Sequence, residues 1–172
     1  MAGAGGPCVF LHFGVSATAC TLLLEQVGYN VADFRIPDER GHVAKNEVIH
    51  EGEPANMTTK VCLDEMLVIL QDVDARVAIS TDPGRYVCNY VYYRSLVWAN
   101  RQTVKHHLDV RSYSSFFRQL QWQHPTYHCC YACFCELQHF ILFVHVPVFR
   151  SVCFEDQVAL ASAIVDILAH MS

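Results

Sequence analysis

The chain has 172 residues, the size of one domain and too short for two large ones. Hydrophobic residues make up 52% of it and charged residues 17%, so it can bury a sizeable core. The formal net charge is -5, which argues against nucleic acid as the main partner because phosphate binding needs clustered lysines and arginines. We therefore predict a single domain over residues 1–172.

Cysteine content and hydropathy bear on the compartment. Nine cysteines are an odd number, and the opening residues MAGAGGPCVFLHFGV lack the basic start of a secretory signal. We therefore expect mostly free thiols in a reducing, cytoplasmic environment. Polar residues such as Glu136 and His145 interrupt the longest apolar stretch, 129–149, so the sequence predicts no membrane span and no membrane partner.

The first half of the chain predicts a strand, an irregular segment and a helix. Residues 8–13, CVFLHF, form an apolar run that ends at a glycine and suits a buried strand. Residues 28–57 are rich in glycine, asparagine, aspartate and proline, which predicts irregular structure with at most a short hairpin. Thr58 or Thr59 can cap a helix that runs to about Gln71.

The second half continues the alternation. Arg76–Thr81 predicts a short strand, and the Asp-Pro-Gly break after it leads into a helix over Arg85–Asn100. Phe140–Val146, FILFVHV, is the clearest buried strand, and Glu155–Met171 is the clearest helix because its apolar residues recur at helical spacing. Strands that alternate with helices predict a parallel sheet covered on both faces.

Residues 101–139 do not fit this order, because they lack periodicity and are long for a connection in a compact domain. We interpret them as an atypical insert. One Cys-x-x-Cys pair in it falls short of a paired zinc-binding arrangement, so we favour the interpretation without a metal and expect no cofactor. The zinc-ligand residue types gathered in the insert are His128, Cys129, Cys130, Cys133, Cys135 and His139.

Cys88 and His145 are the best candidates for a nucleophile and its base. Cys88 lies in the first turn of the helix after Arg76–Thr81, where the helix N-terminus favours a thiolate. His145 lies at the end of Phe140–Val146, so both side chains reach one sheet edge if the two strands are neighbours. The other interpretation is that both pack in the core, as buried cysteines commonly do. Candidates for a third group that orients the imidazole are Glu25, Asp33 and Asp38.

Three segments occur in the order LLLEQVGYNVADFRIPDERG, GRYVCNYVYY and FVHVP. They resemble the glutamate, cysteine and histidine segments of the pyroglutamyl peptidase I family of cysteine peptidases. The resemblance covers about residues 8–98 and 140–170. It implies a three-layer α/β/α sandwich around a mostly parallel sheet, and the removal of N-terminal pyroglutamyl groups from peptides.

The resemblance also implies roles for single residues. Cys88 matches the nucleophile, His145 the general base and Glu25 the acidic third member. The implied partner is a peptide with an N-terminal pyroglutamate. Positions that match an arginine near the catalytic cysteine and the small apolar pocket for the pyroglutamyl ring are Arg35, Ile36, Tyr86 and Val87.

The sequence departs from the family pattern in three places. No loop of the type GFGPFG precedes Cys8, so we expect a domain that is N-terminally truncated relative to the family, with an exposed sheet edge. Ala17 stands where the family tends to have glycine. The insert at 101–139 lengthens the connection to the histidine strand. These departures leave an alternative open, in which a catalytically inactive family member acts as a binding or interaction protein.

Overall fold

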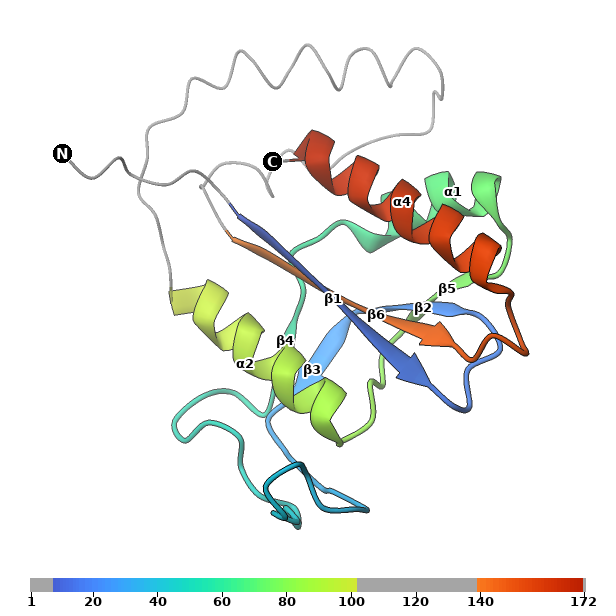
Figure 1. Ribbon diagram of the computed structural model, residues 1–172. Helices are drawn as coiled ribbons and strands as arrows, with labels where there is room; N and C mark the ends of the chain where they lie inside the picture. The colour runs from blue at the N-terminus through green and yellow to red at the C-terminus, as the bar shows by residue number, and fades with distance from the viewer. Residues whose placement is uncertain (1–7, 102–138, 172) are drawn as a thin grey trace, which may run out of the picture.

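The computed structural model describes residues 8–101 and 139–171. Each strand and helix that the sequence predicts is found there, with ends that differ by a few residues. Within these residues the elements are β1 Val9–Ser16, β2 Leu22–Glu25, β3 Val27–Tyr29, β4 Asn56–Thr58, α1 Leu63–Val73, β5 Val77–Ser80, α2 Val87–Arg101, β6 Phe140–Pro147 and α4 Phe154–Met171 (Figure 1).

The main sheet is mixed rather than wholly parallel. Its strand order is β1-β6-β2-β5, with β1 and β2 each parallel to one neighbour and β2 antiparallel to β6. Two of its three strand pairs are parallel, which agrees with a mostly parallel sheet, and the antiparallel pair involves β2, a strand that the sequence analysis did not predict. The connection between β1 and β2 is residues 17–21, far shorter than the dozen or so residues that a parallel crossover needs. β2 therefore runs in the direction opposite to β1 and β6.

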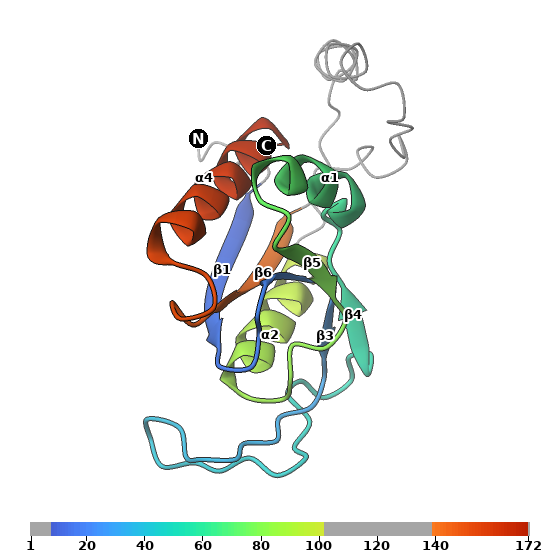
Figure 2. The ribbon, with the colours of Figure 1, turned by 90° about the vertical axis from the view of Figure 1, so that its right-hand side faces the viewer.

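Helices cover both faces of this sheet, which confirms the predicted α/β/α sandwich (Figures 1 and 2). Helices α1 and α4 lie together on one face, and α2 lies on the other. Apolar side chains build the core between the sheet and the helix pair, because both helices present apolar residues at helical spacing to it. The buried helix residues in this core are Leu63, Met66 and Leu70 of α1 and Leu160, Ile164 and Leu168 of α4.

Helix α2 packs against β6 on the opposite face. Tyr92 and Leu96 lie against Ile141 and Phe143 in a second buried cluster. Near the C-terminal end of α2, Trp98 contacts the ring of a β1 residue, Phe10, with the ring centroids 5.0 Å apart. The helix therefore ends near the start of β1 and begins over the other end of the sheet, where β1 and β6 finish (Figure 1).

The irregular segment predicted at 28–57 is closed at its two ends by the antiparallel pair β3–β4. Thr59 does not cap α1, because the helix begins only at Leu63 with Cys62 at the N-cap position. The Thr59 hydroxyl instead donates a hydrogen bond to the backbone oxygen of Ile141 in β6. The predicted insert lies outside the described residues except for its ends, Arg101 and His139. No helix among the described residues combines the length and apolarity needed to span a membrane.

Candidate active site

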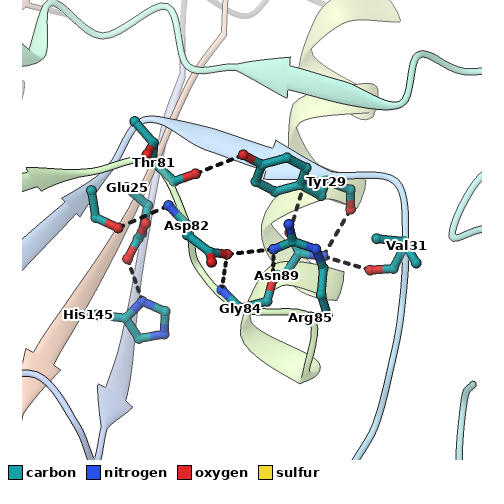
Figure 3. Close-up of polar contacts among 10 residues, drawn as sticks. Glu25, Tyr29, Val31, Thr81, Asp82, Gly84, Arg85, Asn89 and His145 are labelled. Carbon is teal, nitrogen blue, oxygen red and sulfur yellow. Dashed lines mark hydrogen bonds and ion pairs between the residues drawn. The ribbon is translucent and has the colours of Figure 1, made fainter. Parts of the chain in front are cut away.

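Antiparallel pairing places Glu25 and His145 on the same face of the sheet. Leu23 pairs with His145 and Glu25 pairs with Phe143, so Glu25 and His145 are diagonal neighbours. Glu25 Oε1 lies 2.7 Å from His145 Nδ1 (Figure 3). Glu25 is fully buried and His145 is 7% exposed. A buried carboxylate is costly unless it is paired, so the imidazole is the partner that makes this position tolerable.

The surroundings of His145 favour its charged form. Burial by itself lowers the pKa of His145, but hydrogen bonds and negative charge from Cys88 and Glu25 outweigh this effect and raise the pKa to about 9. The ring is therefore protonated at neutral pH and carries an N–H on both nitrogens. Nδ1–H donates to Glu25, which leaves Nε2–H for the Cys88 sulfur.

The Cys88 sulfur sits beside the β1–β6 pair at the level of His145. Cys88 is the second residue of α2, partly buried, with a free thiol. Gly14 of β1 is the register partner of His145. A Cβ atom built on Gly14 would lie 3.0 Å from Cys88 Sγ and 2.8 Å from Cζ of Phe143. The missing side chain of Gly14 therefore makes room for the sulfur, a role that a lone glycine inside an apolar strand signals in the sequence.

Cys88 reaches His145 by a different route from the predicted one. The sequence analysis placed both side chains at one sheet edge on the condition that β5 and β6 are neighbours. Instead β2 lies between them, and β5 runs antiparallel to β6. The loop 81–86 carries the chain to the end of the sheet where β1 and β6 finish, and α2 begins there. The condition is therefore not met, and the loop before α2 rather than a pairing of β5 with β6 brings Cys88 to this end of the sheet.

Of the three acidic candidates, the structure places only Glu25 against His145. The Asp33 carboxylate lies 3.7 Å from Nζ of Lys45. Asp38 accepts hydrogen bonds from the backbone N–H groups of residues 40 and 42, so it holds a turn. The antiparallel β2–β6 pairing is what brings Glu25 to the imidazole.

The residues predicted to bind substrate lie at and near the start of α2. The Tyr86 hydroxyl is 3.5 Å from the backbone oxygen of Pro37, and this contact brings Arg35 and Ile36 toward the helix start. Arg35 is exposed, Ile36 is 60% exposed, and Val87, directly before Cys88, is 37% exposed. Their assignment to substrate binding remains a prediction.

The candidate zinc cluster lies outside the described residues except for His139. His139 Nδ1 accepts a hydrogen bond from the backbone N–H of Cys8 at 3.1 Å. Residues 8–101 and 139–171 contain no group of three His, Cys, Asp or Glu side chains placed to hold a metal ion. The zinc alternative therefore stays a prediction for the insert.

Similar sequences and structures point to one family. The family model for pyroglutamyl peptidase matches residues 5–111, more than half of the chain. The pyrrolidone-carboxylate peptidase of Deinococcus radiodurans is 34% identical over 92 residues, which are 54% of this chain and 42% of that protein. A human pyroglutamyl-peptidase 1-like protein is 36% identical over 92 residues, 52% of this chain and 45% of that protein. The chain spans less than half the length of these two relatives.

Solved structures agree on the fold. The pyrrolidone carboxyl peptidase of Fervidobacterium islandicum matches with a TM-score of 0.68 and 22% identity, covering 96% of this chain and 70% of that one. That of Thermococcus litoralis matches with a TM-score of 0.65 and 19% identity, covering 95% and 68%. With the family match over residues 5–111, which include Glu25, Arg35 and Cys88, the chain belongs to the pyroglutamyl peptidase family.

Proposed function

We propose that this chain is a cysteine peptidase that removes N-terminal pyroglutamyl groups from peptides. The observation that carries the proposal is the 2.7 Å contact between Glu25 Oε1 and His145 Nδ1, beside a free thiol at a helix start. A nucleophile, a base and a group that orients the base are the parts that acyl transfer through a thiol requires. The names of the relatives support the pyroglutamyl substrate.

In the first step the Cys88 thiolate attacks the carbonyl carbon of the pyroglutamyl residue's scissile amide. A C–S bond forms, and the electron pair of the carbonyl bond moves onto oxygen. The N–H groups in the first turn of α2 have no partner inside the helix, so they are the donors that this site offers to the oxyanion. The positive end of the helix dipole adds to the stabilisation.

In the second step His145 Nε2–H gives its proton to the leaving amine, and the C–N bond breaks. The thioester that remains is attacked by water, and Nε2 takes the proton from the water. Free pyroglutamate then leaves with regeneration of the thiolate and the imidazolium. The bond between Glu25 and Nδ1 keeps the ring turned toward the sulfur.

The substrate and the compartment follow from the same chemistry. We place the apolar part of the pyroglutamyl ring on Ile36, Tyr86 and Val87, with Arg35 beside them. A nucleophilic thiol stays active only where it is kept reduced, so we place the protein in the cytoplasm.

The experiment measures release of aminomethylcoumarin from its pyroglutamyl amide by purified protein. We expect the wild-type chain to turn over the pyroglutamyl amide much faster than the corresponding alanyl amide. Cys88→Ser should lose this turnover. Cys20→Ser is the matched control, because Cys20 is exposed and has a free thiol. Turnover retained in Cys88→Ser would rule out the nucleophile. A folded wild-type protein without turnover would overturn the proposal and favour the inactive, interacting family member.

A further inference from the structure

Asn89 is a fully buried polar residue directly after Cys88 in α2. Its side chain makes three hydrogen bonds, all to the backbone of residues 29–31 (Figure 3). Oδ1 accepts from the Tyr29 N–H at 2.8 Å. Nδ2 donates to the backbone oxygens of Tyr29 at 2.9 Å and Val31 at 3.0 Å. The amide therefore uses both of its donors and its oxygen.

These bonds tie the start of α2 to the chain that leaves the glutamate strand. β3, which ends at Tyr29, follows β2 and Glu25 after a single residue. The Asn89 amide pairs with the N–H and C=O of Tyr29 much as a neighbouring strand would. The helix that carries Cys88 and the segment that follows Glu25 are thus joined by partly buried hydrogen bonds, made by the residue next to the thiol.

The Tyr29 side chain braces the loop that precedes α2. Its hydroxyl donates to the backbone oxygen of Thr81 at 3.0 Å. The Arg85 guanidinium lies 3.8 Å from the centre of the Tyr29 ring and 2.6 Å from Oδ1 of Asp82 (Figure 3). These hydrogen bonds are exposed, so water competes with them more than with the Asn89 bonds, which are partly buried. Asn89 is accordingly the stronger of the two attachments.

We propose that Asn89 is a positioning residue for the Cys88 thiol. The proposal rests on the proposed function and adds to it the means by which the sulfur is held beside Gly14 and His145. The backbone at Cys88 cannot shift along or away from the sheet without straining the Asn89 bonds, which therefore fix the point from which the thiol projects. A displacement of about 1 Å at a reacting atom can cost on the order of a hundredfold in rate.

The test variant is Asn89→Asp, which keeps the size of the side chain. It loses both donors and sets a carboxylate against the backbone oxygens of Tyr29 and Val31. We expect kcat to fall by about a hundredfold with little change in KM, because the pyroglutamyl pocket is built from other residues.

Asn30→Asp is the matched control for a merely structural effect. Asn30 is also buried, and it makes the same three kinds of bond within its own loop. Its Oδ1 accepts from the His50 N–H at 2.8 Å, and Nδ2 donates to the oxygens of His50 at 2.9 Å and Glu53 at 3.1 Å. Both variants should lower the unfolding temperature, but only Asn89→Asp should lower kcat.

A second readout does not depend on turnover. Iodoacetamide labels Cys88 at pH 6.5, and the tryptic peptide Tyr86–Arg94 reports the label by mass spectrometry because it contains only this cysteine. We expect labelling at least about tenfold slower in Asn89→Asp than in the wild type, since the thiolate loses the nearby imidazolium, and unchanged labelling in Asn30→Asp.

Equal labelling rates in the two variants, each measured below its unfolding temperature, would overturn the proposal. If Asn89→Asp does not fold, Asn89→Ser removes the same bonds without adding a charge and is judged by the same comparison. If the wild-type chain shows no turnover, the proposed function fails, while the labelling comparison still decides the role of Asn89.

Discussion

Glu25 and His145 meet as diagonal neighbours across the antiparallel strands β2 and β6, with Oε1 2.7 Å from Nδ1. Both side chains are buried, so water does not compete for their hydrogen bond. The Cys88 sulfur lies on the other side of His145, against Gly14 in the neighbouring strand. Sheet register fixes two members of the candidate triad, and the start of one helix supplies the third.

Removal of the Glu25 charge should disable the site while the fold remains. In Glu25→Gln the imidazolium loses its ionic acceptor, and the orientation of Nε2 toward the sulfur is no longer enforced. We expect kcat for the pyroglutamyl amide to fall by on the order of 10⁴-fold. Glu39→Gln, at an exposed position, should leave kcat unchanged. A Glu25→Gln enzyme within tenfold of the wild type would show that the carboxylate does not act on the base.

His145 should make the stability of the protein depend on pH. Its pKa is raised from an ordinary value of 6.5 to about 9 in the folded chain, so the folded state binds the proton more tightly than the unfolded state. The resulting stabilisation is complete below pH 6.5 and is lost as the pH rises from 6.5 through about 9. We expect the unfolding temperature of the wild type to fall more steeply over this window than that of His145→Gln. Parallel curves for the two proteins would contradict the raised pKa.

Gly14→Ala should displace the Cys88 sulfur by steric overlap with the new methyl group, not by backbone strain. The new Cβ would lie 2.8 Å from Cζ of Phe143 and 3.0 Å from Sγ of Cys88, so one of them must move. We expect a loss of about 1–3 kcal/mol in the free energy of unfolding, measured in urea, together with a lower kcat. Adding Phe143→Leu should restore part of the stability, because the ring is the nearest obstacle. No recovery in the double variant would locate the clash elsewhere.

The apolar layer between α4 and the sheet can be tested with adjacent residues of one helix. Ile164 is fully buried in the core, and Val165 is 51% exposed. Ile164→Ala should lower the free energy of unfolding by about 2–5 kcal/mol. Val165→Ala should change it by less than about 0.5 kcal/mol, since no packed neighbour is lost. Similar losses in both variants would mean that the predicted face of α4 is not the buried one.

Local patterns in the sequence predicted most of the elements. The apolar periodicity of α4 and the apolar run of β6 each reflect burial, and burial can be predicted from the hydrophobicity of the side chains. β2 was not predicted because its four residues include three successive leucines, which lack the alternation and β-branching typical of strands. β2 is held by pairing with β5 on one side and β6 on the other, and no local pattern expresses that pairing.

The sequence by itself determined most of the elements, the two-sided covering of the sheet and, through three motifs, the family, and it nominated Cys88, His145 and Glu25 as the candidate triad. Only the tertiary structure decided how these residues meet. The short connection after β1 forces β2 to run antiparallel to β6, and that register is what sets Glu25 beside His145. Gly14 and Asn89 gained their roles in the same way, because a close approach between β1 and α2, or between α2 and the end of β3, joins residues far apart in the chain.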